Sequence, residues 1–415
     1  MPLHRTLDLL AASRYRYPVA QLPRFALSPV PKLPLRPPIT VVVSLEGLAT
    51  SPLGCYGCSW NQTPAIDALA ADGLVWDRWT SPIDRPRGLI TSWLCQSAAV
   101  IDQANRRGRS YFLTDDQTLT VPEQSQNFQS VIHLRPNRLE TPAESIEQTT
   151  LAQSFTAAIN EIDSQTSLLW LHSAALRDIW DAPLEEIDDE GPLEPIEHAS
   201  DQDDGSESQT EPVEPFRLPS RTDVPSLRLH PDQDDPDMPF AWTERYAAQV
   251  RVLDTMLDSL CQALEKRKAT IVVAGSSGFS LGQNGWIGHR QGPLRSQDIR
   301  LPLIVSSGGP LRIPTLQTAD ELPELLARIA DRRPLVTPEQ WCHNDEPFAP
   351  MIQTESDRAR AAVTTATWFY VDDAPEQSLG DEKLYLKPDD VDDCNDISRL
   401  RREVLDELAA VAGQH

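Results

Sequence analysis

The chain of 415 residues has no apolar run close to the roughly 20 residues that a membrane-spanning helix needs. Residues 1–37 contain Pro and Arg but no continuous apolar segment, so we expect no secretory signal. Only six cysteines are present, and the pair Cys55 and Cys58 has no second Cys-x-x-Cys to complete a zinc site. These absences favour a cytoplasmic protein with reduced thiols.

The chain also contains fewer basic than acidic residues. Lys and Arg total 37 against 62 Asp and Glu, which gives a formal net charge of −25. A surface of this sign disfavours nucleic acids and anionic membranes as partners. Residues 184–238 hold 18 acidic residues and three arginines, whereas residues 1–37 hold six basic residues and one acidic residue.

Residues 184–238 lack hydrophobic periodicity and are rich in Pro, Ser and Gln. Such a segment cannot bury enough apolar surface to offset the entropy of ordering, so we expect a disordered acidic insertion. Its Asp runs show no turn of the kind that a Ca²⁺ loop requires. We expect residues 1–37 to form an irregular arm, and either segment is a candidate for binding a protein partner, whose identity the sequence leaves unknown.

Residues 40–45 form a short β-branched run that predicts a buried strand of a mostly parallel sheet, and Glu46 stands where this strand ends. In residues 63–73, a capping Thr, a Pro at the first helical position and a closing Gly predict a helix. Because ligands bind at the carboxyl ends of strands in open α/β sheets, we expect Glu46 and the loop 84–87 at that edge.

Several later segments continue the alternation of strands and helices. Apolar residues recur at helical spacing through residues 244–266, and residues 167–172, 269–275 and 299–305 are strand candidates. The segments with distinctive motifs are L-G-C-Y-G from Leu53, T-P-x-I-D-x-L-A-x-x-G from Thr63, R-Y-x-x-x-V-x-x-x-D from Arg245, I-R-L-P-L-I-V from Ile299, W-F-Y from Trp368 and L-Y from Leu384.

In order and spacing, these motifs resemble the sulfatases of the alkaline-phosphatase-like superfamily. The resemblance covers residues 38–412 apart from the acidic insertion. It implies an α/β fold with a mostly parallel central sheet flanked by helices and a small C-terminal α+β domain. The implied domains are residues 38–310 and residues 311–415.

The resemblance also implies a divalent cation, Ca²⁺ or Mg²⁺, held by hard oxygen ligands in active members. Glu46 aligns with the first metal-ligand Asp of the family. Ser276 and Ser277 occupy the positions of the Asp and His of the family's S-D-H-G motif. Since a hydroxyl cannot supply the charge that holds a hard dication, this change removes most of the metal site.

At the other site positions, some family residues are replaced and others are retained. Asp84 takes the place of the nucleophile, and formylglycine cannot be made from Asp. Arg87 and His289 stand at catalytic positions, His289 matching a Lys or His that contacts the sulfate. His172 at a strand end and Arg177 correspond to substrate-binding positions. Either His also fits an ordinary structural hydrogen-bonding role.

We interpret the chain as a sulfatase-like pseudoenzyme without ordinary sulfuric-ester hydrolysis or a resident cofactor, which binds an anionic ligand or a protein partner. We expect Glu46 and Asp84 to pair with Arg85 or Arg87 in place of a cation. The alternative is an active sulfate- or phosphate-ester hydrolase with a rearranged site, in which Glu46 and Asp84 work with Ca²⁺, Mg²⁺ or a water molecule.

Overall fold

The computed structural model describes residues 37–85, 87–120, 127–184, 221–230, 237–288, 292–337, 350–373 and 382–413. The predicted arm before residue 37, residues 185–220 and 231–236 of the predicted insertion, and His289 lie outside this part of the chain. No helix in the described residues is both long enough and apolar enough to span a bilayer.

Nine strands of the described chain form one sheet. They are β1 (Ile39–Glu46), β2 (Leu74–Thr80), β3 (Arg109–Thr114), β4 (Ser130–His133), β5 (Thr166–Ser173), β7 (Ala269–Ser277), β10 (Arg300–Leu301), β11 (Leu303–Val305) and β12 (Leu311–Thr318). Their order is β10-β2-β11-β7-β1-β5-β3-β4, and β12 pairs with β2. β7, β1, β5, β3 and β4 are mutually parallel, whereas β10 and β11 run antiparallel to their neighbours. The sheet is therefore mostly parallel, as the sequence predicts.

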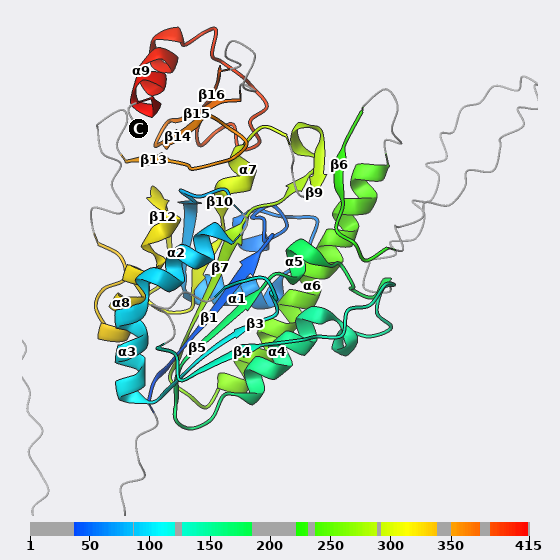
Figure 1. Cartoon of the computed structure of the whole chain (residues 1–415), viewed down its shortest axis with the longest axis vertical. Helices are drawn as coiled ribbons and strands as arrows, with labels where there is room; N and C mark the ends of the chain where they lie inside the picture. The colour runs from blue at the N-terminus through cyan, green and yellow to red at the C-terminus, as the bar shows by residue number, and fades with distance from the viewer. Residues whose placement is uncertain are drawn as a thin grey trace, which may run out of the picture. The chain divides into compact units, whose positions relative to one another are not determined.

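The central strand β1 is buried on both faces because its side chains alternate between two cores. Val41 and Val43 pack with helices α1 (Pro64–Asp72), α4 (Thr150–Asn160) and α6 (Met238–Leu264). Val42 packs with helices α2 (Gly88–Gln96), α3 (Ala98–Arg107) and α8 (Leu322–Asp331) on the other face. The sheet thus lies between two helical layers (Figure 1), which explains its continuous apolar strands.

A small antiparallel sheet follows near the C-terminus. Its strands are β13 (Met351–Gln353), β14 (Ala361–Thr365), β15 (Trp368–Asp372) and β16 (Glu382–Leu386), and helix α9 (Arg402–Ala412) packs on it through Leu405 and Leu408. We expected the C-terminal domain to start at residue 311. Instead, β12 pairs with β2 of the large sheet, and α8 packs against that sheet. Ile313 of β12 and Leu322 of α8 both belong to one hydrophobic core of the large sheet.

Part of the predicted disordered insertion is ordered, which corrects that prediction for residues 221–230. Strand β6 (Ser226–Arg228) pairs with β9 (Trp286–Gly288), and β9 pairs with β8 (Ser280–Leu281). Val224 is partly buried against the main core. This apolar contact and the backbone pairing compensate for the conformational entropy that the segment loses on ordering. The acidic composition of residues 184–238 as a whole does not reveal these contacts.

Helix α1 begins at Pro64 as predicted, but its cap comes from another element. The Thr63 side chain does not cap the helix; its hydroxyl accepts a hydrogen bond from the Gly54 N–H at 3.0 Å. The carboxylate of Asp254 on α6 accepts from the N–H groups of Ala65 and Ile66 at 3.1 and 2.8 Å. A distant residue therefore satisfies the free donors at the helix start.

We predict that Asp254→Ala lowers the free energy of unfolding by about 1–2 kcal/mol, because two N–H groups at the start of α1 lose their acceptor. Denaturant unfolding followed by circular dichroism measures the change. The matched control is Asp258→Ala, which removes an exposed carboxylate one turn further along the same helix. Equal stability losses for the two variants would contradict the capping role.

Candidate functional site

Three chemically active side chains meet at the carboxyl edge of the large sheet. Glu46 ends β1, His172 lies near the end of β5, and Asp116 follows β3. Because these three strands are adjacent and parallel, their ends meet at one edge. All three residues are buried, and one potential ligand atom of each lies within 4.8 Å of the others.

An arginine guanidinium contacts both carboxylates of this cluster. Arg177 belongs to the short helix α5 (Ala175–Asp178), which directly follows β5. Its Nη1 forms an ion pair with Glu46 Oε2, its Nη2 lies 3.6 Å from Asp116 Oδ2, and its Nε donates to Asp178 Oδ1 at 2.8 Å. Arg87 Nε donates to Asp116 Oδ2 at 2.5 Å. Two guanidinium groups therefore face the two buried carboxylates, Glu46 and Asp116.

The backbone after β1 is shaped for the approach of Arg177. Gly47 has φ +81°, and a Cβ at this position would lie 2.9 Å from the Arg177 backbone nitrogen. The Tyr246 hydroxyl donates to the Gly47 carbonyl at 2.7 Å and accepts from the Ala49 N–H at 2.9 Å. Any side chain in place of Gly47, an additional carboxylate ligand included, would collide with α5. The close approach of Arg177 therefore leaves no room for a ligand side chain at position 47.

Burial and the neighbouring charges set the protonation states of the cluster. Burial lowers the pKa of His172 from 6.5 to about 4, and the attraction of Asp116 offsets only part of this effect. Burial by itself raises the pKa of Asp116, but hydrogen bonds from Arg87 and Thr118 outweigh it, so the net pKa is lowered. Near neutral pH the cluster holds an uncharged imidazole beside an ionised carboxylate.

A pocket of about 430 Å³ opens above the cluster, and its lining includes Asp84, Arg87, Arg177, Ser277 and Arg358. Both carboxylate oxygens of Asp84 are engaged: Arg358 donates to them at 2.6 and 2.9 Å, and the Ser356 hydroxyl donates at 2.6 Å. We call this pocket, which Arg85 also lines, the rim pocket. Arg358 lies between β13 and β14, so the small sheet's segment closes one side of the site.

The structure brings together most of the residues predicted from the sequence, but with other partners. Glu46 pairs with Arg177 and Asp84 with Arg358, so the expected pairing of either with Arg85 or Arg87 is wrong. Arg85 instead lies 3.2 Å from an Asp357 oxygen. Arg358 is the favoured partner of Asp84 because its guanidinium donates to both oxygens of that carboxylate.

The two serines at the end of β7 have different environments. Ser277 Oγ accepts a hydrogen bond from the Gly47 N–H at 2.9 Å, which ties β7 to the chain after β1. Ser276 Oγ is buried and has no hydrogen-bond partner among the described residues. Neither serine adds a charge to the cluster.

Asp116 and Arg358 were not predicted from the sequence. The available signal for Asp116 was the acidic pair Asp115-Asp116 directly after the segment that forms β3. Asp115 itself is structural, since it accepts from the hydroxyls of Ser154 and Ser173 at 2.9 and 2.5 Å. Arg358 carries no comparable signal, because it precedes a strand of the small sheet.

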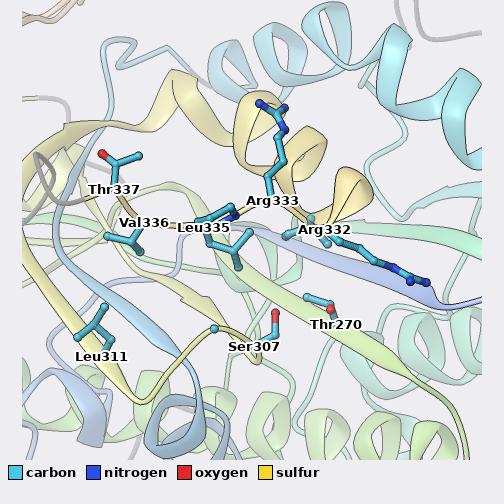
Figure 2. Close-up of a pocket in the computed structure, with 11 residues that line it drawn as sticks. Thr270, Ser307, Leu311, Arg332, Arg333, Leu335, Val336 and Thr337 are labelled. Carbon is cyan, nitrogen blue, oxygen red and sulfur yellow. The ribbon is translucent and has the colours of Figure 1, made fainter.

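A second pocket, of about 760 Å³, lies near Thr270 at the start of β7 (Figure 2). Ser277 and the rim pocket are at the other end of the same strand. Among the described residues, the lining of this second pocket includes Leu311, Leu335 and Val336 but no carboxylate or imidazole. These residues therefore offer neither a carboxylate or imidazole general base nor a charged metal ligand.

The chemistry of the cluster decides whether the dication implied by the sequence resemblance fits this site. Two carboxylates and an imidazole are suitable donors by type. However, Glu46 and Asp116 already contact the guanidinium groups of Arg177 and Arg87. A dication would meet two cations in a buried space, with two serines in place of charged ligands. In this arrangement the residues do not fit a resident Ca²⁺ or Mg²⁺.

Solved structures similar to the chain share this fold. A phosphonate monoester hydrolase of Agrobacterium radiobacter is 13% identical, with a TM-score of 0.60, and the match covers 91% of this chain and 96% of that one. BT4656, solved in complex with its substrate D-glucosamine-2-N,6-O-disulfate, is 14% identical with a TM-score of 0.63, over 91% and 97% of the chains.

BT1596, a 2-O GAG sulfatase, is 13% identical with a TM-score of 0.55, over 90% and 91% of the chains. No family model matches the chain. No curated protein matches it either. The fold is therefore the alkaline-phosphatase-like fold of sulfatases, and the chemistry must be argued from the site itself.

We predict that His172 makes folding sensitive to acid. Between its ordinary pKa of 6.5 and its folded pKa of about 4, the unfolded chain binds a proton that the folded chain does not. Stability is therefore lost as pH falls through this window, by on the order of 3 kcal/mol. The free energy of unfolding of wild type minus that of His172→Asn should fall by this amount over the window. A difference that is independent of pH would contradict the assignment.

Proposed function

We propose that this sulfatase-like protein is a pseudoenzyme in which an arginine has taken the place of the catalytic cation. The observation that carries the proposal is the contact of Arg177 with both Glu46 and Asp116. Arg177 lines the rim pocket, while Glu46 is fully buried and does not. A substrate entering the pocket would meet a guanidinium where a hydrolase needs a metal-activated group.

The position of the lost nucleophile supports the same proposal. Asp84 is held by Arg358 through both carboxylate oxygens. Freeing Asp84 as a nucleophile requires breaking this largely buried pair, and the Arg358 guanidinium then keeps its contact with Asp298 at 3.2 Å but loses two hydrogen bonds to Asp84. Such a rearrangement is costly, because a buried charge loses its partner. Asp84 therefore has a structural role that joins the loop after β2 to the segment before β14.

The function that the site retains is binding. Arg85, Arg87, Arg177 and Arg358 line the rim pocket, and each also contacts a carboxylate. An anionic ligand binds there by sharing guanidinium N–H groups with these acids, at the more exposed Arg85 and Arg87 first. Segments 1–37 and 184–238 remain the proposed sites for a protein partner.

The second candidate is an active ester hydrolase with a rearranged metal site. The proximity of Glu46, Asp116 and His172 favours it, because these are three donors suited to a divalent cation. It requires the Arg177 side chain to leave the two carboxylates. The two candidates therefore differ in whether the wild-type chain takes up a metal.

We predict that the full chain, after exposure to Ca²⁺ and Mg²⁺ and removal of the excess, retains less than stoichiometric metal. We also predict that it leaves 4-nitrophenyl sulfate and 4-nitrophenyl phosphate intact, because the charge site is filled by Arg177. Elemental analysis and absorbance assays measure the two results, with an active sulfatase as the assay control. Stoichiometric metal together with turnover that Asp84→Ala abolishes would overturn the proposal.

A further inference from the structure

A separate pocket of about 380 Å³ lies between the edge of the large sheet and the small sheet. Its polar lining includes Arg78 on β2, Arg300 on β10 and Thr364 on β14. None of its lining residues lines the rim pocket. We call it the β2–β14 pocket.

The two arginines of this pocket have no acidic partner at ion-pair distance in the described part of the chain. Arg78 donates to the backbone carbonyls of Ala366 and Thr365 at 2.5 and 2.7 Å, and Arg300 donates to the carbonyl of Asp77 at 3.1 Å. These carbonyls satisfy hydrogen bonds but carry no net charge. Burial, followed by repulsion from Arg300, lowers the pKa of Arg78 to about 10.

Two nearby acids, Asp77 and Asp393, are paired with other cations. The Asp77 carboxylate forms an ion pair with Arg312, and Asp393 lies 2.5 Å from Lys387 Nζ. Asp77 and Asp392 attract the charge of Arg300 only at longer range. Two positive charges are therefore left close together at a partly desolvated surface, where an anion is the natural counter-charge.

A buried hydroxyl points to the same ligand. Thr364 lines the pocket, its residue is only 7% exposed, and its Oγ1 has no hydrogen-bond partner among the described residues. Buried hydroxyls are normally hydrogen-bonded, so this one marks a place where a partner is missing. It can donate to an anionic oxygen held by the arginines.

The apolar part of the lining is formed by Ile299, Pro314, Pro388 and Val391, and the remaining lining residues are Asp77, Thr80, Ser296 and Lys387. The volume lies within the range of sites that bind small organic molecules. We propose that the β2–β14 pocket binds a small organic phosphate monoester. Its dianionic phosphate matches the two uncompensated guanidinium groups and the Thr364 hydroxyl, and its apolar body packs on the prolines and Val391.

Such a ligand would bridge elements that are far apart in the sequence. Arg78 and Arg300 belong to the large sheet, whereas Thr364 and Val391 belong to the small sheet and the segment that follows it. Arg78 already joins the two sheets through the carbonyls of Thr365 and Ala366. Bound phosphate adds a charged link at the same junction, so we expect it to raise the thermal unfolding temperature.

The test uses phenyl phosphate as the probe on the full chain, with inorganic phosphate and benzoate as comparison ligands. Calorimetry should show that phenyl phosphate binds more tightly than either, since it alone offers both the dianion and the ring. Arg300→Gln should weaken its binding about ten- to a hundredfold, and Thr364→Val about three- to tenfold. Thr364→Val leaves the charges unchanged, so it remains informative if Arg300→Gln folds poorly.

The matched control is Arg109→Gln, the same substitution at an exposed arginine that lines neither this pocket nor the rim pocket. Unchanged binding by this variant supports the assignment. No measurable binding to wild type, or equal binding by Arg300→Gln and Arg109→Gln, would overturn it. Phosphate release measured in the same samples reports separately on the proposed lack of hydrolysis.

Discussion

The contact between the Arg177 guanidinium and the carboxylates of Glu46 and Asp116 determines what this site can do. Parallel strands that end at one edge bring acidic side chains together, and buried carboxylates require a counter-charge. In a metal-dependent hydrolase a dication supplies that charge and also activates the reacting groups. A guanidinium supplies the positive charge but has no open coordination position, so it stabilises the buried carboxylates without activating a reacting group.

The surrounding structure is adapted to this arrangement. Gly47 gives the backbone of α5 room to approach, and the Tyr246 hydroxyl holds the chain from the Gly47 carbonyl to the Ala49 N–H. Across the rim pocket, Arg358 neutralises Asp84 in the same manner as Arg177 neutralises Glu46. Asp84 and Glu46 thus hold ion pairs that connect separate elements of the chain.

The sequence predicts the fold well because local patterns carry it. The β-branched run before Glu46 and the Pro64 helix start both correspond to elements with nearly the predicted bounds. The ion-pair partners could not be predicted, because they depend on the direction of side chains from α5 and from the segment before β14. The cluster residue Asp116 was visible only as an acidic pair after a strand, and the role of His289 stays a prediction.

The claim that Arg177 takes the place of a cation is tested most directly by the binding of divalent cations to the full-length Arg177→Ala variant. Calorimetry and thermal unfolding measure this binding. Removing the guanidinium exposes Glu46 and Asp116 to an added cation, so Ca²⁺ or Mg²⁺ should bind to this variant and raise its unfolding temperature. Neither effect should occur in wild type or in Arg177→Ala combined with Asp116→Asn. Equal cation binding by wild type and Arg177→Ala, or no binding by Arg177→Ala, would contradict the account.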